Sequence, residues 1–229
     1  MSLSTQQINF QVGGHGTVSG LVMSPPDAFA CYVFAHGAGA GMGHAFMGAV
    51  SEGLAARGIA TLRYQFPSME LGKKRPDPPP VAHAAVRAAV AQAVERFGPL
   101  PLFAGGKSFG GRMTSQAQAL DPLPRVKGLV FVGFPLHPAG TPSTGRADHL
   151  SDVRVPMLFV QGTRDALADL AGIRTVVAKL GAFATLMEIA EADHAFHVLR
   201  RSGRKDEEVL VEMLDGTAGW MRARLPAPP

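Results

Sequence analysis

The stretch LPLFAGGKSFGGRM, residues 100–113, contains the pattern that decides the fold. Leu100–Gly105 is an apolar run of strand length, and Phe109–Leu120 after it has the length of a helix. Between them stands G-x-S-x-G, at Gly106–Gly110. The motif alone is weak, but between a strand and a helix it predicts a sharp turn that lifts the Ser108 hydroxyl out of a sheet. The glycines suit such a turn because neighbouring Cβ atoms would clash there.

The same alternation of apolar runs and helical stretches continues along the chain. The runs that read as strands are Val18–Met23, Ala30–Ala35, Ile59–Phe66, Leu100–Gly105, Val126–Phe134, Val155–Gly162 and Ala184–Ala190. The stretches that read as helices are His44–Arg57, Val81–Arg96, Phe109–Leu120, Leu167–Leu180 and Glu207–Arg224. This order predicts an α/β fold with a doubly wound, mostly parallel sheet and helices on both faces. The first two runs precede any helix and predict an antiparallel hairpin at the sheet edge.

The length of 229 residues and the unbroken alternation predict one domain over residues 1–229. The Pro-rich stretch Pro67–Pro80 is expected to be a surface loop, because the strand–helix alternation resumes directly after it. Only Leu136–Val155 separates the fifth apolar run from the sixth. That segment is too short for a large lid domain, so we expect an open site.

Composition excludes several classes of protein. With 46% hydrophobic and 17% charged residues, the chain is not disordered. The net charge of +4 is small and its charges are interspersed, which argues against a nucleic-acid partner. No apolar run reaches the roughly 18 residues of a membrane span, and no signal peptide is recognised. The single cysteine, Cys31, lies in an apolar run, which favours a reducing, cytoplasmic location.

Polar residues that can do chemistry cluster where the predicted strands end. In a doubly wound sheet, functional groups lie in the loops after the carboxyl ends of strands. Four such loops carry polar or glycine-rich sequence: His36–His44, Gly105–Gly111, Gly162–Asp169 and Glu191–His197. We therefore expect these four loops to form one site.

A serine hydroxyl needs a base before it becomes a good nucleophile. In folds with this turn the chain order is Ser, then acid, then His. His194 directly follows the last strand and is favoured as the base of Ser108, with His197 as the alternative. Asp165 directly follows its strand and is favoured as the acid that orients His194. The less well placed acids are Asp169, Asp148 and Asp152.

Acyl transfer also requires N–H groups that hold a developing oxyanion. The N–H of Phe109, directly after Ser108, is one candidate. The second is expected in the glycine-rich loop after Ala30–Ala35, at Ala38 or next at Gly39. His36 precedes the serine in the chain, so it is expected to support the loop by hydrogen bonding rather than to act as base.

Other polar residues have a functional and a structural interpretation. His137 follows a strand end and Arg112 lies just past the turn, so either could line the pocket or serve a structural role. Lys73–Arg75 is expected to be a solvated loop, the alternative being attraction of anionic substrates. No phosphate-binding loop is predicted, because Pro101 stands where the first glycine is required.

Neither a metal nor a cofactor is expected. Asp193, His194 and His197 could bind a metal, but no further cluster with ligand spacing accompanies them.

Together these motifs resemble a known family. The residues that carry the resemblance are FAHGAGAGMGH (34–44), GGKSFGGRM (105–113), FPLHPAG (134–140), PMLFVQGTRD (156–165) and ADHAFH (192–197). They resemble compact α/β-hydrolases of the dienelactone-hydrolase-like kind. More narrowly, they resemble the group that includes testis-expressed protein 30 and a scaffold subunit of a nuclear histone acetyltransferase complex. The resemblance implies Ser108 as nucleophile, Asp165 as acid and His194 as base. Dienelactone hydrolases proper have cysteine at the nucleophile position, so their substrate is not carried over.

The expected function is a serine hydrolase that cleaves a carboxylic ester or thioester through an acyl-enzyme. Its partner would be a small-molecule acyl substrate, with no nucleic acid or membrane involved. The alternative is an interaction module of the same fold whose site is vestigial. A weaker option is a perhydrolase or C–C hydrolase that uses the same three residues. The pattern makes no prediction about oligomeric state.

Overall fold

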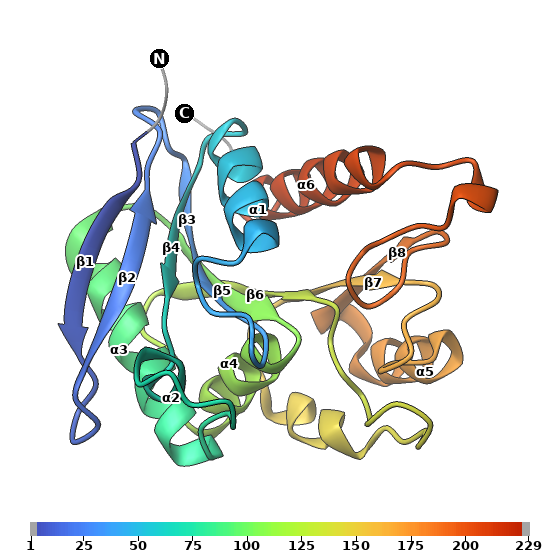
Figure 1. The fold of residues 1–229 in the computed structure, drawn as a ribbon, viewed down its shortest axis with the longest axis horizontal. Coiled ribbons are helices and arrows are strands. Elements are labelled where there is room, and N and C mark those ends of the chain that lie inside the picture. The colour runs from blue at the N-terminus through green and yellow to red at the C-terminus, as the bar shows by residue number, and fades with distance from the viewer. Residues whose placement is uncertain (1–3, 226–229) are drawn as a thin grey trace.

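The computed structural model describes residues 4–225, and its centre is one eight-stranded sheet. The strands are β1 (Gln6–Gln11), β2 (Thr17–Met23), β3 (Ala30–Ala35), β4 (Ile59–Tyr64), β5 (Leu102–Lys107), β6 (Val126–Val132), β7 (Met157–Gly162) and β8 (Ala184–Ile189). Their order across the sheet is β1-β2-β4-β3-β5-β6-β7-β8 (Figure 1). The strands from β4 to β8 in this order pair in parallel, and β1 and β2 pair antiparallel. The predicted mostly parallel sheet is confirmed.

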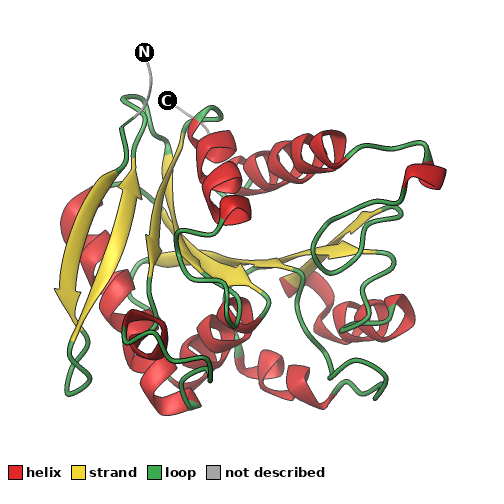
Figure 2. Cartoon of the chain, viewed as in Figure 1, coloured by secondary structure: helices red, strands yellow, loops and turns green. Residues whose placement is uncertain are grey.

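Helices cover both faces of the sheet (Figure 2). They are α1 (Ala45–Ala55), α2 (Pro67–Glu70), α3 (Pro79–Phe97), α4 (Phe109–Leu120), α5 (Leu170–Leu180) and α6 (Asp206–Arg222). The described residues also form three 3₁₀ helices: η1 (Gly145–Asp152), η2 (Gly181–Phe183) and η3 (Arg200–Ser202). Helices α1 and α6 pack on one face, and α3, α4 and α5 pack on the other. No helix within residues 4–225 has the length and apolarity needed to cross a bilayer.

The central strands are apolar on both faces because both faces are covered. Every residue of β3, β4 and β7 is buried. On one side they contact Met47 and Leu54 of α1 and Met213 of α6. On the other side they contact Val86 of α3 and Met113 of α4. Packing against two layers fixes the carboxyl ends of the strands, where the candidate site lies.

The predicted hairpin between Val18–Met23 and Ala30–Ala35 is wrong. Strand β2 pairs antiparallel with β1 and with β4, whereas β3 lies between β4 and β5. The edge is antiparallel as expected, but its outer strand is β1, which the sequence analysis missed. Only Ile8 and Phe10 of β1 are buried, so this short polar strand has too few apolar residues to show a clear pattern.

The Pro-rich stretch is not entirely a loop. Its start forms the short helix α2, and its last residues begin α3 at Pro79. Proline is tolerated in the first turn of a helix because its missing N–H has no intrahelical acceptor there. Only the segment between the two helices matches the expected exposed loop.

The connection between β6 and β7 holds loop segments and η1 and nothing larger. For the described residues, 4–225, the expectation of no large lid domain is confirmed.

The turn between β5 and α4 packs directly on the end of β3. A Cβ atom added at Gly106 would lie 2.5 Å from the carbonyl oxygen of Ala35, and one added at Gly110 would lie 2.6 Å from that of His36. Real Cβ atoms do not come so close to backbone oxygens, so both positions need glycine. This contact places two of the four predicted site loops side by side.

Gly106→Ala should therefore destabilise the protein. The added methyl forces β3 and the β5–α4 turn apart, and we expect a loss of about 1–3 kcal/mol in the free energy of unfolding, measured by urea denaturation. The matched control is Gly13→Ala, where no described atom lies within 4 Å of the added Cβ. The control should stay within about 0.5 kcal/mol of the wild type. Equal stability of the two variants would contradict the packing described.

Candidate functional site

Ser108 occupies the turn between β5 and α4. Strand β5 continues to Lys107, so Ser108 follows the strand without an intervening residue. Its backbone has φ 49° and ψ −114°, a conformation that residues with a side chain rarely adopt. Its N–H donates to the carbonyl oxygen of Val132 at 3.1 Å, which ties the turn to the end of β6. The strained turn raises the hydroxyl above the carboxyl edge of the sheet.

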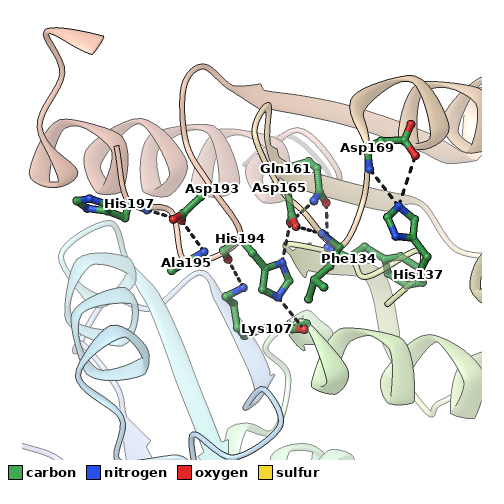
Figure 3. Close-up of polar contacts among 12 residues, drawn as sticks. Lys107, Phe134, His137, Gln161, Asp165, Asp169, Asp193, His194, Ala195 and His197 are labelled. Carbon is green, nitrogen blue, oxygen red and sulfur yellow. Dashed lines mark hydrogen bonds and ion pairs between the residues drawn. The ribbon is translucent and has the colours of Figure 1, made fainter. Parts of the chain in front are cut away.

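Three side chains from three loops form a continuous hydrogen-bonded chain (Figure 3). His194 Nε2 lies 2.9 Å from Ser108 Oγ, and His194 Nδ1 lies 2.7 Å from Asp165 Oδ2. A carboxylate only accepts, so Nδ1 carries the proton and Nε2 is free to accept from the serine hydroxyl. The loops follow β5, β7 and β8, whose carboxyl ends meet at one edge of the sheet.

The alternatives for base and acid lie elsewhere. His197 turns away from His194 (Figure 3). Its Nδ1 pairs with Asp206 Oδ2 at 2.8 Å near the surface. Asp169 caps the N-terminus of α5 instead of contacting His194. Asp148 and Asp152 lie on η1. The favoured pair, rather than these residues, is brought to Ser108.

The carboxylate of Asp165 is fully buried, with 0% of its side chain exposed. A buried charge is tolerated only when hydrogen bonds satisfy it. Gln161 Nε2 donates to Oδ2 at 2.6 Å, and the Leu167 N–H donates to Oδ1 at 2.8 Å. Gln161 Oε1 in turn accepts from the N–H of Phe134 at 2.9 Å. Gln161 was not predicted, although a glutamine at the end of the apolar strand β7 was a usable signal.

Lys107 was also missed, although it is the variable residue directly before Ser108 in the motif. Its Nζ donates to the backbone carbonyl oxygen of His194 at 2.6 Å and lies 5.4 Å from the centre of the Phe196 ring. Burial lowers the pKa of Lys107 to about 8, and the nearby carboxylates of Asp165 and Asp193 oppose that effect. The lysine therefore joins the end of β5 to the loop that carries His194.

Asp193 shapes that loop from within. Its Oδ1 accepts from the N–H of Ala195 at 2.8 Å and of His197 at 3.0 Å (Figure 3). Phe196 has a positive φ of 64°, so the loop turns sharply back on itself. The turn presents His194 toward Ser108 and sends His197 in the other direction.

A cavity of about 340 Å³ opens beside Ser108 and His194. Its apolar walls include Phe46 and Met47 of α1 and Leu167 of the loop after β7. A site of this kind suits a small substrate with an apolar part next to the serine.

The candidate oxyanion donors border this cavity. Phe109 is the first residue of α4, so its N–H has no acceptor within the helix. Ala38 lines the cavity together with Ser108. Gly39, with φ 74°, lies in a small adjacent crevice that Ala38 and Phe109 also line. The structure therefore brings the glycine-rich loop and the serine turn to the same place.

His36 supports the glycine-rich loop. Its Nδ1 donates to the carbonyl oxygen of Gly37 at 2.7 Å, and its Nε2 accepts from the N–H of Phe66 at 3.2 Å. Burial lowers the pKa of His36, which favours the neutral ring that these two bonds require.

His137 and Arg112 do not line the described cavity. His137 is buried and donates through Nδ1 to the carbonyl oxygen of Pro138 at 2.8 Å. Arg112 lies on α4, where burial and the positive charge of Arg146 lower its pKa. Both side chains therefore lie outside the wall that faces Ser108.

The remaining predictions concern the basic side chains of Lys73–Arg75 and the absence of a metal site. Lys73 and Lys74 are exposed and border the small crevice beside Ala38. Within residues 4–225, no group of three or more His, Cys, Asp or Glu side chains is arranged to hold a metal ion.

Comparisons with known proteins agree with this architecture. The chain is similar to a lidless α/β serine hydrolase from Xanthomonas campestris, with 21% identity, a TM-score of 0.75, and 100% of this chain and 99% of the other covered. It is similar to a dienelactone hydrolase from Anabaena variabilis, with 20% identity, a TM-score of 0.79, and coverage of 99% and 100%. An esterase domain from Rhodothermus marinus has 16% identity, a TM-score of 0.74, and coverage of 96% and 99%. Residues 28–222 match the alpha/beta hydrolase domain family. The chain therefore belongs to the α/β-hydrolase family.

Proposed function

We propose that the protein is a serine hydrolase that cleaves carboxylic esters or thioesters through an acyl-enzyme. One observation carries the proposal: the unbroken chain of hydrogen bonds from Asp165 through His194 to Ser108, at 2.7 and 2.9 Å, beside an apolar cavity. The activity requires no cofactor.

In the first half-reaction, Ser108 Oγ attacks the carbonyl carbon of the substrate while His194 Nε2 takes its proton. The carbonyl π electrons move to oxygen, and the N–H groups of Phe109 and Ala38 stabilise the resulting oxyanion. Asp165 accepts from Nδ1 of the imidazolium and stabilises its charge. The intermediate then collapses, and His194 gives the proton from Nε2 to the leaving alcohol or thiol. The acyl group stays on Ser108.

In the second half-reaction, water replaces the serine as nucleophile. His194 Nε2 takes a proton from the water as its oxygen attacks the acyl carbon, and then returns the proton to Ser108 Oγ. A carboxylic acid leaves, and the site is restored. In this mechanism the chain acts as one catalytic domain.

The known proteins similar to this chain include a dienelactone hydrolase and esterases, at identities that establish the fold alone. The narrower resemblance to the group of testis-expressed protein 30 stays a prediction. A vestigial interaction module is the less favoured alternative, because the buried Asp165 and the strained Ser108 would have no use in it.

Lys107 is proposed to position His194. Its ammonium holds the carbonyl oxygen of His194, and its alkyl stem is fixed at the end of β5 next to the nucleophile. Gly133 packs behind both groups, since a Cβ there would lie 3.0 Å from Lys107 Nζ and 3.4 Å from His194 Cε1. The base therefore has a fixed position relative to the serine.

Asp165→Asn tests the acid. The amide cannot fix the required tautomer of His194, so kcat/KM for p-nitrophenyl acetate should fall by roughly 10²–10⁴-fold. Ser108→Ala should lower it by at least about a thousandfold. The matched control is Asp169→Asn, since Asp169 caps α5 and asparagine is also a good cap. The control should keep wild-type activity. Wild-type activity in Ser108→Ala, or equal losses in the two aspartate variants, would rule out these roles.

The burial of Lys107 predicts a pH effect on stability. Burial lowers the pKa from 10.5 to about 8, so the folded protein releases this proton before the unfolded chain does. Below pH 8 the lysine is charged in both states, and the full cost of burying that charge reduces the free energy of unfolding. This cost disappears as the pH rises toward 10.5. Relative to Lys107→Met, the wild-type free energy of unfolding should rise between these values by at most about 1.4 kcal/mol per pH unit.

Urea denaturation of both proteins across pH 7–10.5 measures this difference. Parallel pH dependences would show that the ammonium is not buried as described.

A further inference from the structure

A second hollow, of about 260 Å³, lies next to the Ser108 cavity. It opens between α1, α6 and the loop after β8, on the face of the sheet where α1 and α6 lie together (Figure 1). Phe46 and Ala195 line both the Ser108 cavity and this hollow. The two spaces are therefore neighbours that share a wall.

The walls of the hollow are mainly apolar. The rings of Phe46 and Phe196 stack with centres 5.9 Å apart and planes 12° apart. From α6, Val209 and Met213 are buried and Leu210 is half-buried. Such a surface gains free energy when alkyl groups cover it.

The far rim carries negative charge. Asp206 is paired with His197 and also accepts from the N–H of Val198 at 2.9 Å. Glu207 beside it is exposed and lines the hollow. The carboxylates of Asp206 and Glu207 outnumber the one basic group here, His197, so this end of the hollow disfavours an anionic ligand group.

We propose that this hollow is the acyl-chain subsite of the Ser108 site and that it takes the uncharged alkyl tail of a medium-chain acyl ester or thioester. The carbonyl lies at Ser108, and the chain passes Phe46 and Ala195 to cover Leu210 and Met213. This inference rests on the proposed serine-hydrolase function and adds the substrate class to it.

The experiment compares acetate, butanoate, hexanoate and octanoate esters of p-nitrophenol. Each methylene buried in the hollow should raise kcat/KM by up to roughly fourfold. Leu210→Trp fills the hollow and should lower the ratio of octanoate to acetate kcat/KM by at least about tenfold. The matched control is Val211→Trp on the same helix, because Val211 is 50% exposed and lies outside the hollow. The control should keep the wild-type ratio.

Charge provides a second comparison. The p-nitrophenyl monoester of an eight-carbon dicarboxylic acid should be a poorer substrate than the octanoate ester, since its free carboxylate meets the acidic rim. Equal rates for these two esters would overturn the assignment of an uncharged tail. An unchanged octanoate ratio in Leu210→Trp would overturn the subsite.

A binding measurement separates the subsite from the activity. N-methyl octanamide and N-methyl acetamide carry the same acyl chains as the octanoate and acetate esters. In NMR spectra of protein labelled with ¹³C-methyl methionine, N-methyl octanamide should shift the Met213 resonance, whereas N-methyl acetamide should not. The resonance is assigned by its loss in Met213→Leu. If the wild type hydrolyses no ester but the resonance shifts, the hydrolase proposal fails and the chain-binding hollow stands. If acetate is hydrolysed but neither the ratio nor the resonance responds, the subsite fails alone.

Discussion

The hydrogen bond between the buried carboxylate of Asp165 and Nδ1 of His194 is the contact on which the rest of the site depends. The carboxylate has no exposed surface, so its oxygens require the hydrogen bonds that Gln161, Leu167 and His194 donate to them. That requirement fixes the orientation of the imidazole and leaves Nε2 toward Ser108. The same bond joins the loops after β7 and β8, and the backbone N–H of Ser108 ties its turn to β6.

Two kinds of contact keep this bond in place. Glycines at the β5–α4 turn let the backbone of that turn touch the end of β3, which places Ser108 beside the glycine-rich loop. Lys107, directly before Ser108, then donates to the carbonyl oxygen of His194. The site is assembled from strand ends that both helical layers hold.

The sequence was most informative where a local pattern has a local cause. The serine turn needs small neighbours, and buried parallel strands need continuous apolar runs, so the turn and the sheet type could be predicted. The chain order of serine, acid and histidine in such folds led to Asp165 and His194 as the candidates that accompany Ser108. The sequence was least informative about contacts between distant segments. The pairing of β2 with β1 depends on a polar strand with two inward residues. Lys107 donates to a partner 87 positions away, and Gln161 is held by the N–H of Phe134, 27 positions away. The hollow between α1 and α6 likewise exists only after both helices pack on the sheet.

The proposed function requires that the environment of Ser108 makes its hydroxyl a nucleophile. Labelling with a fluorophosphonate, followed by intact mass and peptide mapping, measures this directly because the reagent needs an activated serine and no particular substrate. We expect one adduct per chain, on Ser108, that is lost in His194→Ala as well as in Ser108→Ala. A folded wild-type protein that stays unlabelled, or one labelled equally in His194→Ala, would contradict it.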